Sequence, residues 1–144
     1  MNRVKSFFLA MKHRNFLNSD LSIYKKFLKK KSIFVNIPKN AGRSIINSIY
    51  GNDLKNCGHR TYIFYKCLFT KKRIQNMYTF SFVRNPYSRL FSAYNFLKKG
   101  GENLHDLNAK RDYIDCFKDF NEFINFGLES AVKNKVIHFV PQYD

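Results

Sequence analysis

Two short apolar runs constrain the fold of this chain more than any other feature. The first spans residues 32–37 and is closed by Pro38, and the second spans residues 77–83 and ends at Arg84. Short runs rich in β-branched and aromatic side chains that end at a turn signal predict buried strands. Each run leads into a segment with helical periodicity. The sequence therefore predicts an α/β fold, a parallel sheet with helices outside it.

Both helices that follow these strands have recognisable ends. After the first strand, residues 40–44 form a tight turn, and apolar residues then recur at helical spacing until Gly51. After the second strand, Asn85 and Pro86 have the signature of an N-cap followed by a first-turn proline. The second helix stops at residues 100–101 and carries an apolar stripe at i, i+3, i+4 and i+7. The stripe consists of Leu90, Ala93, Tyr94 and Leu97.

The remaining segments complete one domain and a lead-in. Residues 1–31 are basic and amphipathic and are predicted to form a helical lead-in, whereas residues 32–144 are predicted to form a single domain. Within that domain, residues 52–58 are predicted as a loop, and residues 61–76 fit either a strand or a helix. Aromatic residues between positions 113 and 126 predict one or two helices that pack in the core.

The charge balance indicates an anionic partner. The 144 residues include 26 Lys and Arg against 10 Asp and Glu, a formal net charge of +16. Nucleic acid, acidic lipid, acidic polysaccharide and a polyanionic cofactor all fit such a balance, and charge alone does not choose between them. Hydrophobic residues make up 44% of the chain, which excludes a wholly disordered protein.

Neither a metal site nor a membrane span is predicted. The cysteines form no CxxC pair and are expected to be reduced thiols, and the histidines form no ligand grouping. The apolar stretch near the N-terminus is too short to cross a bilayer, so we expect a soluble cytoplasmic protein. In residues 25–31, lysines surround Phe27 and Leu28 and could contact an anionic membrane peripherally, although a solvated helix end is the favoured interpretation.

The turn after the first strand is suited to binding phosphate or sulfate. It joins a strand to a helix, so backbone N–H groups and the positive end of the helix dipole converge there. Lys39 supplies an ammonium group, Arg43 a planar guanidinium and Ser44 a hydroxyl donor. Gly42 lets the backbone approach an anion closely. The turn is not a Walker A loop, because Lys39 precedes its one glycine, and no metal is implied.

A second anion contact is predicted where the second strand ends. Arg84 lies at the carboxyl end of that strand, where α/β proteins bind ligands, and could clamp a phosphate bidentately. Ser92 lies on the following helix and could donate a further hydrogen bond, with Arg89 on the same helix face. Taken alone, this segment also fits a surface arginine beside an exposed serine.

Together the two segments resemble one family. Residues 33–44 resemble the 5′-phosphosulfate loop of carbohydrate sulfotransferases that use 3′-phosphoadenosine 5′-phosphosulfate (PAPS), in which an apolar strand precedes I-P-K-T-A-G-T-S. Residues 80–94 resemble the 3′-phosphate segment of that family, F-V-R-N-P-Y-x-R-L-x-S-A-Y. The resemblance, to sulfotransferase family 2, covers residues 32–144 and departs from the family at Asn40 and Arg43, where Thr is common. Because such enzymes usually continue further, we expect the domain to be incomplete at its C-terminus.

The resemblance implies a P-loop NTPase-like fold, similar to that of nucleotide kinases, and a role for each matched residue. Lys39 would contact the bridging oxygen and the sulfuryl group of PAPS. The turn from Asn40 to Ser44 would hold the 5′-phosphosulfate, and Arg84 with Ser92 would hold the 3′-phosphate. The implied cofactor-binding residues are Lys39, Asn40, Ala41, Gly42, Arg43, Ser44, Arg84 and Ser92.

The catalytic residues implied by the resemblance are His59 and Lys39. Residues 57–62 resemble the Gly-His stretch that carries the proposed catalytic histidine of heparan sulfate 2-O-sulfotransferase and its bacterial relatives. Imidazole titrates near neutral pH and can accept the proton of an acceptor hydroxyl, although an exposed loop histidine is the alternative. Near the end of the chain, residues 138–142 resemble the family's H-x-x-P-Q segment, so His138 and Gln142 are predicted as structural or substrate-contacting residues.

These implications define the predicted function and its alternatives. We expect a sulfotransferase that moves a sulfuryl group from PAPS to a glycan hydroxyl by in-line displacement. Its leaving group is 3′-phosphoadenosine 5′-phosphate (PAP), and no metal takes part. The basic surface favours an anionic glycan, and nucleic acid is not expected as a partner. The alternatives are a basic nucleic-acid-binding protein, a small nucleotide kinase and a catalytically inactive fragment that binds PAPS.

Overall fold

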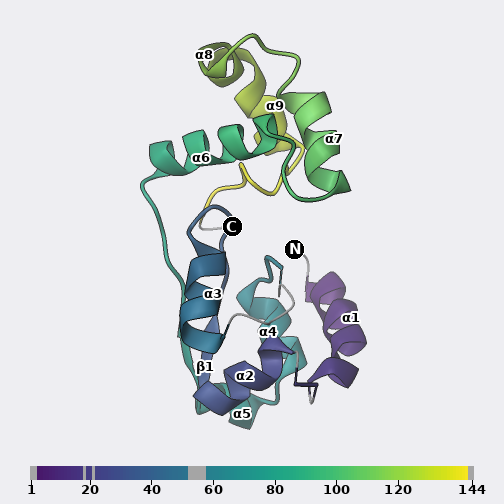
Figure 1. Ribbon diagram of the computed structural model, residues 1–144. Helices are drawn as coiled ribbons and strands as arrows, with labels where there is room; N and C mark the ends of the chain where they lie inside the picture. Colours follow the sequence, from purple (N-terminus) through teal and green to yellow (C-terminus); the bar gives the residue numbers. More distant parts are fainter. Residues whose placement is uncertain (1–2, 18, 21, 52–57, 143–144) are drawn as a thin grey trace. The chain divides into compact units, whose positions relative to one another are not determined.

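The computed structural model describes residues 3–17, 19–20, 22–51 and 58–142. The chain divides into two compact units, Met1–Phe82 (unit 1) and Val83–Asp144 (unit 2). Figure 1 labels the α-helices and β1. Unit 1 contains the sheet, and unit 2 consists of helices and turns where it is described. Most of the predicted loop at 52–58, including Cys57, lies outside the described residues.

Unit 1 combines helices with two short strands. In chain order its elements are α1 (Arg3–His13), η1 (Arg14–Phe16), α2 (Ile23–Lys30), β1 (Ser32–Phe34), α3 (Gly42–Tyr50), α4 (Tyr62–Leu68), α5 (Lys71–Gln75) and β2 (Tyr78–Phe80). The predicted helical lead-in corresponds to α1, η1 and α2. The helix predicted to end at Gly51 is α3, and Gly51 is its C-cap.

The two strands pair in parallel, with Phe34 opposite Phe80. The fold is thus a small parallel sheet flanked by helices, which confirms the α/β character and the parallel pairing expected from the sequence. Both strands are shorter than predicted, but contact between the two segments continues beyond them. The Val35 N–H donates to the Phe80 carbonyl (2.9 Å), and Ser81 Oγ donates to the Val35 carbonyl (2.7 Å). The sheet therefore keeps the ends of both strand segments in register.

The core of unit 1 joins α2 to the sheet. Phe27 of α2 is buried together with Ile33 and Phe34 of β1 and with Tyr50 of α3. The rings of Phe27 and Tyr50 meet edge to face, with centroids 4.8 Å apart. Phe27 is fully buried, so within the basic stretch at residues 25–31 this aromatic side chain belongs to the core.

Residues 61–76, which by sequence fit either a strand or a helix, form α4 and α5. Phe64, Tyr65 and Leu68 are buried and lie at helical spacing, so one face of α4 belongs to the core. Thr70 caps α5 by accepting a hydrogen bond from the Arg73 N–H at 3.4 Å. Burial of this aromatic face favours the helix over a strand, a tertiary effect that local propensity does not reveal.

Helix α1 packs against α4 through a face of small side chains. Ser6 and Ala10 are fully buried there. Another face of α1 leaves apolar side chains at i, i+3, i+4 and i+7 exposed to solvent. These side chains are Val4, Phe7, Phe8 and Met11. Among the described residues, no helix is both long enough and apolar enough to cross a bilayer.

Unit 2 is formed by helices around a separate aromatic core. Its elements are α6 (Pro86–Lys98), α7 (Leu104–Tyr113), α8 (Phe120–Glu122), the π-helical turn η2 (Phe123–Gly127) and α9 (Leu128–Lys133). The predicted apolar stripe of α6 faces this core: Ala93, Tyr94 and Leu97 are buried, and Leu90 packs against them. The predicted aromatic helices between positions 113 and 126 correspond to the end of α7, α8 and η2, of which Phe123 is fully buried.

The start of α6 has the predicted cap. Asn85 Oδ1 accepts hydrogen bonds from the N–H groups of Tyr87 (3.0 Å) and Ser88 (3.2 Å), and Pro86 occupies the first turn. A cap of this kind typically contributes about 1 kcal/mol. It also determines the residue at which the extended chain after β2 becomes helical, and Arg84 lies immediately before it.

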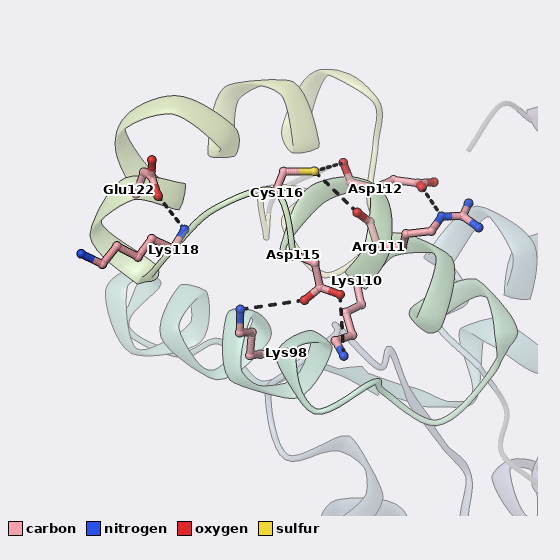
Figure 2. Close-up of polar contacts among 8 residues, drawn as sticks. All are labelled: Lys98, Lys110, Arg111, Asp112, Asp115, Cys116, Lys118 and Glu122. Carbon is pink, nitrogen blue, oxygen red and sulfur yellow. Dashed lines mark hydrogen bonds and ion pairs between the residues drawn. The ribbon is translucent and has the colours of Figure 1, made fainter.

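Exposed carboxylates of unit 2 take part in structural contacts, shown in Figure 2. Asp115 lies 3.8 Å from the ammonium of Lys98 and 3.7 Å from that of Lys110, so it links the ends of α6 and α7. Glu122 accepts a hydrogen bond from the Lys118 N–H at the start of α8 (2.5 Å). Exposed pairs of this kind contribute little each. Their positions are explained by helix ends and caps rather than by a catalytic cluster.

Acidification is expected to weaken unit 1 through His13. Its ring packs edge-on against the rings of Tyr24 and Phe64, with centroids 5.6 and 5.7 Å away. Burial, and secondly the nearby charge of Arg60, lower the pKa of His13 below its usual 6.5. Just below that pH the unfolded chain binds more protons than the folded one, so stability decreases as the pH falls.

The test compares urea unfolding of the wild type and His13→Phe at about pH 7 and about pH 5.5. The variant keeps an aromatic ring in the pocket but cannot be protonated. We expect the wild-type midpoint to fall more than that of His13→Phe. Parallel pH profiles for the two proteins would show that His13 does not carry this dependence.

Candidate anion-binding site

The turn between β1 and α3 has an unusual backbone. Lys39 and Ala41 both adopt left-handed conformations, with φ of 66° and 60°, although neither is glycine. Non-glycine residues in this region cost on the order of 1 kcal/mol each and cluster at functional sites. Backbone turns that alternate between the two hands point successive N–H groups into one concavity, which can hold an anion. The two residues flank Asn40, in the middle of the predicted phosphate turn.

The N-terminus of α3 is not capped by a side chain. Ala41 is its N-cap residue and provides no side-chain acceptor, and the first turn contains no acidic residue. The first backbone bond of the helix runs from the Ile45 N–H to the Ala41 carbonyl at 3.1 Å. The N–H groups of residues 42–44 therefore precede the helical ladder at the positive end of the dipole. Arg43 and Ser44 are exposed there, and Lys39 is half-buried.

Asn40 has a contact that its place in the turn did not predict. Its side chain is buried, and Nδ2 donates to the Phe82 carbonyl at 2.7 Å. This bond fixes the middle of the turn to the chain just after β2. Asn40, one of the two positions at which the chain departs from the family pattern, thus supplies an N–H donor to the backbone.

Gly42 has a packing role that the sequence did not predict. Its φ is not in the left-handed region, but a Cβ at this position would overlap the side-chain amide of Asn36. Asn36 is 6% exposed and lies directly behind the turn. The absent side chain of Gly42 therefore makes room for Asn36. The sequence signal for Asn36 was a polar residue inside an otherwise apolar run, and sequence reasoning did not use it.

The backbone of Asn36 also positions the predicted base. His59 Nδ1 lies 2.9 Å from the Asn36 carbonyl oxygen. A carbonyl can only accept, so Nδ1 carries the hydrogen, and in the neutral ring Nε2 carries the lone pair. His59 is half-buried. The arrangement selects the tautomer that a general base acting through Nε2 requires.

In unit 2, one side chain holds the backbone of Arg84. Gln142 Oε1 accepts from the Arg84 N–H at 3.0 Å, and Gln142 Nε2 donates to the Arg84 carbonyl at 2.9 Å. The Arg84 side chain is exposed. Ser92 is half-buried on α6, and its neighbour on the helix, Arg89, is buried, which lowers the pKa of Arg89. Gln142 thus contacts the segment that the sequence predicts to bind the 3′-phosphate.

His138 lies in the core of unit 2 and is 6% exposed. Its Nε2 lies 2.9 Å from Oδ1 of the equally buried Asp106. Asp106 Oδ2 also accepts from the Glu102 N–H (2.9 Å) and from Asn103 Nδ2 (2.8 Å). Burial alone would raise the pKa of Asp106, but these hydrogen bonds and His138 lower it. His138 therefore anchors the end of the chain to α7.

The predicted site residues fall into two groups, one in each unit. Unit 1 holds the residues predicted for the 5′-phosphosulfate and the base: Lys39, Asn40, Ala41, Gly42, Arg43, Ser44 and His59. Unit 2 holds those predicted for the 3′-phosphate and the acceptor side: Arg84, Ser92, His138 and Gln142. In the described parts of the chain, no cluster of three or more His, Cys, Asp or Glu side chains could hold a metal ion.

Comparison with known proteins identifies the family. A family model described as "Sulfotransferase family" matches residues 27–144, which is most of the chain and includes both predicted anion-binding segments. The chain therefore belongs to the sulfotransferase family, which confirms the family suggested by its two motifs and supports sulfuryl transfer as its general chemistry. Searches of curated proteins and of solved structures found no match.

Replacement of Gly42 by alanine tests the packing behind the turn. The added methyl would overlap the Asn36 amide, so we expect Gly42→Ala to lose about 1–3 kcal/mol of stability in urea unfolding. Ser48→Ala, an exposed change on the same helix, should stay within about 0.5 kcal/mol of the wild type.

A double variant distinguishes this overlap from other effects of the methyl group. Asn36→Ala removes the amide that the methyl would meet. The loss in Asn36→Ala/Gly42→Ala should therefore be smaller than the sum of the two single losses. A Gly42→Ala protein as stable as the wild type would contradict the proposed packing.

Proposed function

We propose that this chain binds PAPS and transfers its sulfuryl group to a hydroxyl of a glycan. The observation that carries the proposal is the uncapped N-terminus of α3, preceded by left-handed Lys39 and Ala41, in a chain of the sulfotransferase family. The parallel strands and the turn between β1 and α3 also favour a P-loop NTPase-like arrangement around that site.

The residues of the turn fit a phosphosulfate. Its oxygens are acceptors only, and the turn offers donors: the N–H groups of residues 42–44, the Ser44 hydroxyl and the cationic side chains of Lys39 and Arg43. The first turn of α3 contains no acidic residue, so the positive end of the helix dipole carries no opposing charge from that turn. PAPS would supply an activated sulfuryl group on a phosphate leaving group.

Each residue then has a definite task. Lys39 stabilises negative charge that develops beside the sulfuryl group, as cations in water-poor sites do effectively. His59 Nε2 accepts the proton of the acceptor hydroxyl, while Nδ1 stays bonded to the Asn36 carbonyl. Arg84 and Ser92 hold the 3′-phosphate through charge-assisted and neutral hydrogen bonds. The net charge of +16 favours an anionic glycan as the acceptor.

Calorimetry with PAP tests the donor site. We expect wild-type protein to bind PAP and Arg84→Ala to bind it about 10- to 100-fold more weakly, because one charge-assisted contact is lost. Lys39→Ala should bind PAP with a smaller loss but transfer sulfuryl groups about 100-fold or more slowly. Lys29→Ala, an exposed lysine at the end of α2, controls for general loss of positive charge.

The outcomes separate the alternatives. Failure of the wild type to bind PAP would overturn the proposed donor. Binding without turnover on any glycan tested would leave a PAPS-binding protein without transferase activity. Equal effects of Lys29→Ala and Arg84→Ala would show that binding depends on charge in general, as in a nucleic-acid-binding protein.

Substitution of His59 tests the base. His59→Gln keeps a polar side chain in the loop but removes the titratable nitrogen, so we expect a drop of about 10²–10⁴-fold in kcat. PAP affinity should stay within about twofold of the wild-type value, since His59 is not assigned a contact with the sulfuryl donor. The acidic limb of the pH–rate profile should also disappear. Turnover at the wild-type rate would remove His59 from the mechanism.

A further inference from the structure

The stretch that carries Arg84 has little support from regular structure. It lies between the end of β2 and the start of α6, outside any strand, and Val83 is 74% exposed. The Arg84 backbone is nevertheless bonded at both of its polar groups, and both partners belong to the Gln142 side chain. The two distances, 3.0 and 2.9 Å, are ordinary hydrogen-bond lengths.

A primary amide is suited to this contact. It presents an acceptor and a donor side by side, whereas an extended residue presents its own N–H and carbonyl on one side of the chain. The amide of Gln142 therefore takes the place of a neighbouring strand for the single residue Arg84. A carboxylate could replace only the acceptor, and a hydroxyl is too small to span both groups.

The segment that carries Gln142 is anchored in the core of unit 2. Three and four residues before Gln142, Phe139 and His138 are buried in the core. His138 bonds to Asp106, and the ring of Phe139 lies 5.1 Å from that of Phe123 between centroids. Gln142 is therefore carried by an anchored segment, and its amide can restrain Arg84 rather than follow it.

The guanidinium of Arg84 differs from its backbone. Within the residues that the structure describes, it makes no hydrogen bond or ion pair, and the side chain is exposed. The structure thus combines a fixed main chain with an unengaged cation. That combination is typical of a binding residue whose position is prepared before its ligand arrives.

We propose that Gln142 is a positioning residue for Arg84, and that it prepares the Arg84 guanidinium to bind the 3′-phosphate of the sulfuryl donor. The inference rests on the proposed function, because it takes that phosphate as the ligand of Arg84. It assigns Gln142 to the donor side of the reaction, where sequence resemblance had suggested a structural role or contact with the acceptor. Without the two Gln142 hydrogen bonds, the Arg84 backbone would become ordered only when the donor binds. Binding would then carry the conformational-entropy cost of that ordering.

The experiment measures PAP affinity by calorimetry for Gln142→Met, which keeps the length of the side chain but removes both hydrogen bonds. We expect affinity to fall about tenfold, the effect of having to order one backbone residue on binding. The matched control is Gln75→Met, at an exposed glutamine of α5 in unit 1, which should bind PAP as the wild type does. Thermal unfolding of each variant checks that it is folded.

A double-mutant cycle separates positioning from general damage. If Gln142 acts through Arg84, then Gln142→Met should weaken PAP binding little or not at all in an Arg84→Ala background. Hydrogen exchange of the Arg84 amide should also accelerate in Gln142→Met, independently of any ligand. A purely structural role would reduce affinity by the same factor in both backgrounds.

Each other outcome overturns the inference in a recognisable way. PAP binding by Gln142→Met at wild-type affinity would refute the positioning role and leave the proposed function intact. Equal losses in the two backgrounds would reduce Gln142 to a structural residue. Failure of the wild type to bind PAP would instead refute the proposed function, and with it the ligand assigned to Arg84.

Discussion

The parallel pairing of β1 with β2 is the interaction on which the rest of unit 1 depends. Regular pairing ends at Phe34 and Phe80, but the two segments stay together through the Val35 N–H and the Ser81 hydroxyl. Asn40 then reaches the Phe82 carbonyl. Because parallel strands end at the same edge of a sheet, these contacts place the turn before α3 beside the end of β2. A short sheet can therefore fix the candidate anion-binding turn, whose own backbone is strained.

Asn36, behind that turn, contacts both the start of α3 and the candidate base. The Asn36 side chain occupies the space that Gly42 leaves open, and the Asn36 carbonyl sets the tautomer of His59. A substitution that displaces Asn36 would therefore also shift the carbonyl that bonds to His59. The constraint is steric on one side of Asn36 and polar on the other. The steric contact involves the Asn36 side chain, and the polar contact involves its backbone carbonyl.

Much of the fold could be predicted because it depends on local patterns. The parallel strands, the Asn85 cap and the stripe on α6 follow from periodicity and turn chemistry within a few residues. The missed features depend on contacts between distant residues or on conformations that residue type does not reveal. Gln142 and Arg84 are 58 positions apart, and neither Lys39 nor Ala41 is a residue that normally adopts positive φ. The helical α4 likewise follows from burial of its aromatic face against the rest of unit 1.

Two side-chain amides of the chain can be understood in the same physical terms. Asn40 and Gln142 both use a side-chain amide to hold backbone that follows β2, at Phe82 and at Arg84 respectively. Because the amides satisfy these two carbonyls, no cationic side chain is needed to do so. Neutral contacts of this kind suit a strongly basic chain, because uncompensated cations repel one another and oppose folding. Neutral amides can order the segments that carry cations without adding to that repulsion.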